Sequence, residues 1–154
     1  MKTTRSVNSP QIQRLAEVAL YLQRNFLALV AETVQKNDMS VPQFNLLGFL
    51  AGDEALNMNK LASLMKHTTP ATTGLVDRLV RSDLVERLSS PTDRRQVLVK
   101  ITAKGQAMFK ELKMEIAKTL NDIAQKLPDE DLAAWFRIYE ANYEYFTSNN
   151  YLGT

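Results

Sequence analysis

One stretch, residues 57–102, constrains the fold of this chain more than any other. Two short helical patterns come first, and then two β-branched runs that flank a turn rich in Ser, Pro and Asp. Such runs around a turn predict a β-hairpin. The second helix has a clear start, because Thr69 can cap it and Pro70 then sits where a missing N–H costs nothing. The stretch therefore predicts a helix pair followed by a hairpin.

The second helix has two different faces. Apolar residues recur at three- and four-residue spacing, which predicts one buried face: Leu75, Val76, Leu79 and Val80. Small and charged residues occupy the opposite face: Thr73, Gly74, Asp77, Arg78 and Arg81. The hairpin tip carries Asp93, Arg94 and Arg95. A helix with a small, polar start beside an arginine-tipped hairpin suits double-stranded DNA, with the helix in the major groove and an arginine in the minor groove.

Long amphipathic helices are predicted on both sides of this stretch. The first spans residues 10–36, and two more lie within 103–148, broken at Leu127-Pro128. A shorter helix begins at a capping box formed by Ser40 and Gln43. Because a body of residues 40–102 needs only the short elements, the apolar stripes of the long helices must pack on one another or on a second copy of the chain. The alternative is that Trp135, Tyr139 and Tyr143 belong to an ordinary core within one chain.

Several segments together resemble the MarR family of winged helix-turn-helix regulators. They are SVPQFNLL, LASLM, the Thr-Thr-Pro helix entry, LVDRLVRSDLVER, the hairpin PTDRRQVLVKIT and Gly105. The resemblance covers most of residues 39–109, and the D-R-R hairpin followed by a strand and I-T-x-x-G is its most specific part. It implies a mainly α (α+β) fold, with a single domain over residues 1–154, a winged-helix body at 40–102, and helices 10–36 and 103–148 forming a two-fold homodimer.

The resemblance also implies a function. Members of the family are sequence-specific DNA-binding transcription regulators, commonly repressors that bind a near-palindromic operator. Many are released by a small effector, often an aromatic or phenolic anion, bound between the dimerisation helices and the DNA-binding body. Met39, Phe44 and Phe49 could line such a pocket or could equally be core. The operator, the target genes, the effector and the sign of regulation are not encoded in any recognisable residue.

The candidate DNA-binding residues come from the helix and the hairpin: Thr69, Pro70, Ala71, Thr72, Thr73, Arg78, Asp93, Arg94 and Arg95. The resemblance places Arg94 in the minor groove, and Asp93 could hold an arginine by a charge-assisted bond. The alternatives are that the threonines only cap the helix and that the tip is an exposed turn. His67 could contact a phosphate or be a plain turn residue. Asp77 could pair with Arg81 four residues later.

Charge and composition narrow the function classes. Residues 58–104 hold nine Lys or Arg against four Asp or Glu, whereas residues 105–154 hold five against eight. Positive charge therefore gathers on the segment expected to bind DNA, although a solvated surface would look similar. There is no cysteine and one histidine, so no metal site or cofactor is expected.

No catalytic motif and no membrane-length apolar run is recognisable. The sequence thus predicts a cytoplasmic protein that is not an enzyme. Gly74 is an argument against DNA binding, because many members of the MarR family have a basic residue at this position. A winged-helix module that contacts proteins and not DNA is the main alternative.

Overall fold

The computed structural model describes residues 9–52, 54–91, 93 and 96–148. Within them the chain is mostly helical with one small sheet. The elements follow in this order: α1 (Pro10–Gln35), α2 (Val41–Leu50), β1 (Leu56–Asn57), α3 (Met58–Met65), α4 (Thr69–Arg81), β2 (Val85–Ser89), β3 (Val97–Ile101), α5 (Ala103–Ala124) and α6 (Asp129–Ser148). This architecture confirms the predicted mainly α fold with a β-hairpin wing.

The helix starts show why these segments are helical. Ser40 and Gln43 form the predicted capping box at α2, and Thr102 accepts from the Gly105 amide at the start of α5. Asn57 caps α3. The prediction for α4 was wrong by one residue, because Thr68 and not Thr69 is the N-cap and accepts from the Ala71 amide. Two consecutive threonines precede the proline, and either could supply a capping hydroxyl.

The sheet contains one strand more than the hairpin. β2 and β3 pair antiparallel with Val85 opposite Ile101, and β1 pairs on the other edge of β3 through Leu56 opposite Val99. β1 was not predicted, because a strand of two residues carries no alternation of apolar and polar positions. It nevertheless ties the start of α3 to the wing.

A compact core holds α2, α3, α4, the sheet and the adjoining ends of α1 and α5 together. Its fully buried large side chains are Leu46, Leu47, Leu50, Leu61, Leu79 and Leu112. Gly105 is needed here, since a Cβ at this position would lie 2.0 Å from the Leu84 carbonyl oxygen. The first turn of α5 therefore packs directly on the backbone that follows α4.

Three hydrogen bonds fasten the same junction. The Thr102 amide donates to the Leu84 carbonyl at 3.0 Å, and the Thr102 hydroxyl donates to the Asp83 carbonyl at 2.8 Å. Lys104 Nζ donates to the Ser82 carbonyl at 2.8 Å. These contacts satisfy carbonyls just past the C-terminal end of α4, so α5 and α4 are joined rigidly.

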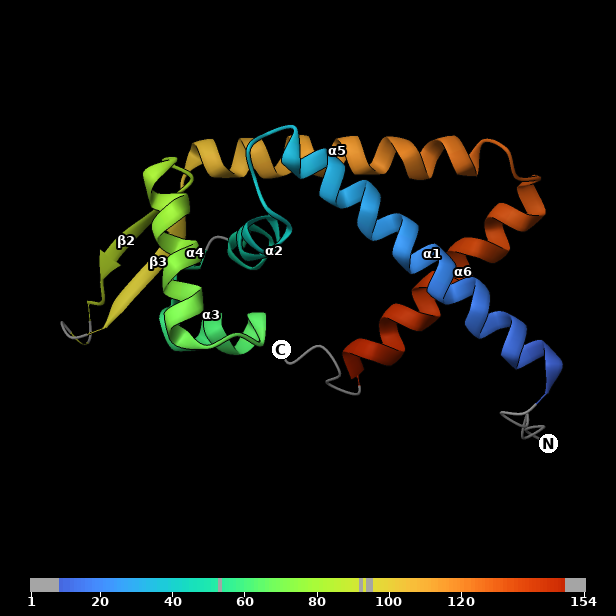
Figure 1. Cartoon of the computed structure of the whole chain (residues 1–154), viewed down its shortest axis with the longest axis horizontal. Helices are drawn as coiled ribbons and strands as arrows, with labels where there is room; N and C mark the ends of the chain where they lie inside the picture. Colours follow the sequence, from blue (N-terminus) through green and yellow to red (C-terminus); the bar gives the residue numbers. More distant parts are fainter. Residues whose placement is uncertain (1–8, 53, 92, 94–95, 149–154) are drawn as a thin grey trace.

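The terminal helices extend away from this core (Figure 1). α5 runs from the winged-helix body toward α6, while the hairpin lies on the opposite side of α4. α6 has no buried residue at all, and Tyr139 and Tyr143 are 60% and 69% exposed. The alternative in which these tyrosines form an ordinary core within one chain is therefore wrong for this chain. None of the helices in the described part is long and apolar enough to cross a membrane.

Candidate nucleic-acid interface

Helix α4 presents one buried and one exposed face, as its sequence predicts. Thr72, Val76 and Leu79 are buried on the inner side. Helical geometry turns the opposite side outward, and the residues exposed there include Thr69, Pro70, Ala71, Gly74, Arg78 and Arg81. The N-terminal half of this exposed face carries no charge, and the C-terminal half is basic.

The two neighbouring threonines of α4 have different environments. Thr72 is fully buried, and its hydroxyl donates to the Thr68 carbonyl at 3.0 Å. Thr72 was predicted to touch DNA, and the structure corrects this, because a side chain with no exposed surface is not available for a base contact. Thr73 is half-buried at the edge of the outer face, and its hydroxyl donates to the Thr69 carbonyl at 2.8 Å.

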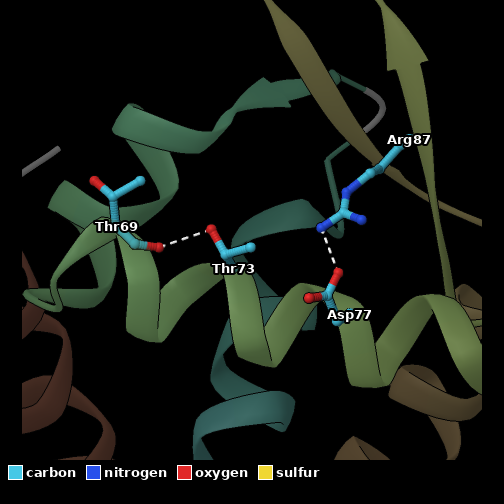
Figure 2. Close-up of polar contacts among 4 residues, drawn as sticks. All are labelled: Thr69, Thr73, Asp77 and Arg87. Atoms are coloured by element: carbon cyan, nitrogen blue, oxygen red, sulfur yellow. Dashed lines mark hydrogen bonds and ion pairs between the residues drawn. The ribbon is translucent and has the colours of Figure 1, made fainter.

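An ion pair joins α4 to the wing. Arg87 Nη2 on β2 donates to Asp77 Oδ1 on α4 at 2.6 Å. Figure 2 shows Thr69, Thr73 and Asp77 in succession along α4, on the side that faces Arg87. The proposed pair between Asp77 and Arg81 is thus replaced by a partner ten residues away. No local sequence pattern singles out Arg87, since only the hairpin geometry brings it next to α4.

The hairpin is closed by a short turn whose described atoms bond locally. The Gln96 amide donates to the Asp93 carbonyl at 2.9 Å, and the Ser90 amide donates to the Gln96 carbonyl at 3.1 Å. The Asp93 amide donates to the Ser90 hydroxyl at 3.3 Å. Arg94 and Arg95, the predicted tip contacts, lie outside the described residues. The wing strands leading to them stand beside α4, as the DNA-binding hypothesis requires.

Two hollows border the winged-helix body. The larger, about 500 Å³, lies between the end of α1 and the start of α2 and is lined by Val34, Asp38, Met39 and Gln43 among others. Met39 is buried but contributes to this lining, whereas Phe44 packs on Phe109 with ring centroids 5.2 Å apart.

The smaller hollow, about 160 Å³, is lined by Phe49 and by His67, which lies in the turn before α4. Of the three residues considered for an effector pocket, Met39 and Phe49 therefore line hollows and Phe44 is part of the packing. Among the described residues no three His, Asp or Glu side chains gather in a way that could hold a metal ion.

Comparison with known proteins places this geometry in a family. The MarR family model matches residues 37–96, which run from the end of α1 through the wing turn. The uncharacterized HTH-type transcriptional regulator YfiV of Bacillus subtilis is 39% identical over 77 residues, which are 50% of this chain and 48% of YfiV. The aligned part thus spans about half the length of YfiV. The B. subtilis regulator YsmB is 26% identical over 131 residues, covering 82% of this chain and 89% of YsmB.

The whole fold also has a counterpart among solved structures. A MarR family protein from Bacillus stearothermophilus superposes with a TM-score of 0.83 over 92% of this chain and 99% of its own, at 22% identity. That likeness includes the terminal helices as well as the winged-helix body. The family match over the winged-helix segment and the relatives above show that the chain is similar in sequence to the MarR family of winged helix-turn-helix transcription regulators, and the solved structure shows that it has the fold of a MarR family protein.

Proposed function

We propose that this chain acts as a homodimer that binds a near-palindromic operator, represses transcription from it, and is released by a small-molecule effector. The observation that carries the proposal is the pairing of an exposed, basic α4 face with a wing fixed beside it by Asp77 and Arg87. A helix in the major groove and a wing in the adjacent minor groove use both features.

The exposed apolar faces of the terminal helices support the dimer. Large hydrophobic side chains are exposed along α1 and α6: Leu15, Leu20, Leu22, Phe26, Phe136, Ile138, Tyr139 and Tyr143 among them. Exposed apolar side chains in such number on two helices indicate an interaction surface. A second copy related by a two-fold axis would cover the same helices on both chains and would place two α4 helices about one DNA turn apart.

Positive charge supplies the affinity in this proposal. The exposed Arg78 and Arg81 on α4 lie where DNA phosphates flank a helix in the major groove. Arg94 and Arg95 at the hairpin tip are proposed to enter the minor groove, where narrow A·T-rich segments concentrate negative potential. Asp93 is proposed to orient one of these arginines. Thr69, Pro70 and Ala71 are exposed at the start of α4 and are proposed to face the bases.

The hollow between α1 and α2 supports the proposal that a small-molecule effector binds this protein. It lies where a dimerisation helix meets the winged-helix body, and its volume of about 500 Å³ falls within the usual range for small-molecule sites. A ligand there that fits only one spacing of the two α4 helices would shift the population toward that spacing. Asp38 in its lining repels an anion, so a neutral or cationic effector is favoured over the phenolic anions common in the family.

The direct test is retention on double-stranded DNA at several salt concentrations, with Arg78→Gln and Arg81→Gln as charge-removing variants. Arg137→Gln on α6 is a matched control, because it removes an equal positive charge away from α4. Binding that falls steeply with salt, with a shallower slope for the two arginine variants only, is expected. Retention that does not depend on salt, or no retention at all, would favour the protein-interaction module and refute the proposal.

A further inference from the structure

The hydroxyl group of Thr73, at the edge of the outer face of α4, makes a hydrogen bond within the helix. It donates its hydrogen to the Thr69 carbonyl at 2.8 Å (Figure 2). A threonine hydroxyl has one hydrogen and two lone pairs. While this internal hydrogen bond is kept, Thr73 Oγ1 acts toward a base as an acceptor.

The first two turns of α4 contain no arginine or lysine, the side chains that donate two hydrogen bonds to guanine. Residues 69–75 read TPATTGL, without Arg, Lys, Asn, Gln or His. Guanine offers only acceptors, N7 and O6, to the major groove. The exposed residues here are Thr69, Pro70, Ala71 and Gly74, and most of their side-chain atoms are carbon. Such a surface suits the C5-methyl group of thymine.

Gly74 is exposed on the same surface, and no packing contact within the protein requires a glycine there. A Cβ built at this position meets nothing within 4 Å. Glycine in an exposed helix interior is destabilising relative to alanine, and folding would therefore favour alanine. Its bare backbone lets the edge of a base pair approach α4 more closely than any side chain would allow.

We propose that α4 selects A·T base pairs, with Thr73 Oγ1 accepting from the N6 amino group of adenine and the carbon surface contacting thymine methyl groups. Gly74, which has no side chain, lets the base-pair edge come close to the backbone of α4. An A·T pair supplies both the amino donor and the methyl group, whereas a G·C pair supplies an amino donor from cytosine but no methyl group. The inference rests on the proposed DNA-binding function and names the base chemistry that it uses.

The test begins with duplexes selected from a random pool by the full-length protein. In the selected duplex each adenine is replaced in turn by 2′-deoxynebularine, which lacks the N6 amino group, and each thymine by deoxyuridine, which lacks the methyl group. The proteins compared are wild type, Thr73→Val, which keeps the size but loses the acceptor, and Thr73→Ser, which keeps the acceptor.

At one adenine in each half-site, removal of the amino group should weaken wild-type binding roughly two- to tenfold, the range for one neutral hydrogen bond. Thr73→Ser should show the same sensitivity. Thr73→Val should bind the natural duplex more weakly by a similar factor and should be insensitive to the analogue. Gly74→Ala should raise the melting temperature and yet weaken binding, because the added methyl group stands between helix and groove.

Four results would overturn the inference. One is equal sensitivity of wild type and Thr73→Val to every adenine analogue. Another is a selected motif with G·C pairs at all positions that α4 protects. A third is Gly74→Ala with unchanged affinity, and the last is no loss of binding at any deoxyuridine. Failure to bind any sequence in the pool is a different outcome, since it refutes the DNA-binding function itself.

Discussion

The ion pair between Asp77 and Arg87 gives the sharpest quantitative prediction. It joins α4 to the wing across 2.6 Å, and its side chains are 46% and 38% exposed. Ion pairs at this exposure contribute about 0.2–1 kcal/mol to the free energy of unfolding, and a short charge-assisted bond belongs near the upper end. We expect a coupling energy of about 0.5–1 kcal/mol between the two side chains.

The assay is a double-mutant cycle on urea unfolding with Asp77→Asn, Arg87→Gln and the double variant. Protein concentration must be held constant, because the stability of a dimer depends on it. A matched cycle replaces Arg87→Gln by Arg81→Gln, which removes an equal charge four residues from Asp77 on the same helix. The coupling between Asp77 and Arg87 should shrink as salt rises, and the coupling between Asp77 and Arg81 should stay near zero.

The same double-mutant cycle, measured by DNA-binding affinity, tests whether the ion pair positions the wing for DNA binding. Arg87→Gln releases the wing from α4, so binding should weaken by more than the loss of one phosphate contact explains. A larger coupling for Asp77 with Arg81 than with Arg87 would refute the structural assignment. Full affinity in Asp77→Asn, despite a measurable loss of stability, would show that the ion pair does not position the wing for DNA.

Three further predictions concern packing, assembly and the wing tip. Gly105→Ala should lower the free energy of unfolding by about 2 kcal/mol or more, since its Cβ would meet the Leu84 carbonyl; Gly52→Ala, with nothing within 4 Å, should be nearly neutral in the same urea titration. Tyr139→Glu on α6 should reduce the mass seen by light scattering from twice the 17.4 kDa chain mass toward one chain, and an unchanged mass would contradict the proposed dimer surface. Arg94→Ala should weaken specific binding by about 1–3 kcal/mol and lower the salt slope by about one unit, with melting unchanged; a lowered melting temperature would make Arg94 structural.

The helices and the hairpin could be predicted because each carries its own local pattern. The capping box of Ser40 and Gln43 predicted the start of α2, and apolar spacing predicted the buried face of α4. The burial of Thr72 could also have been predicted, since it lies four residues before Val76 and so on the same face of the helix.

Long-range contacts could not be predicted in this way. The partner of Asp77 depends on how the hairpin folds back on α4, and the need for glycine at position 105 depends on how closely α5 approaches Leu84. The short strand β1 exists only because β3 offers it an edge. The proposed acceptor role of Thr73 depends on the hydrogen bond that its hydroxyl donates to the Thr69 carbonyl, which the apolar spacing of α4 does not specify.

The proposed dimer inserts two α4 helices into successive major grooves on one face of DNA. The arrangement of half-sites in DNA selected from a random pool tests it most directly. We expect an inverted repeat whose half-site centres are about one helical turn apart, roughly 10–10.5 base pairs. A single unrepeated motif, a direct repeat, or half-sites separated by half a turn would contradict it.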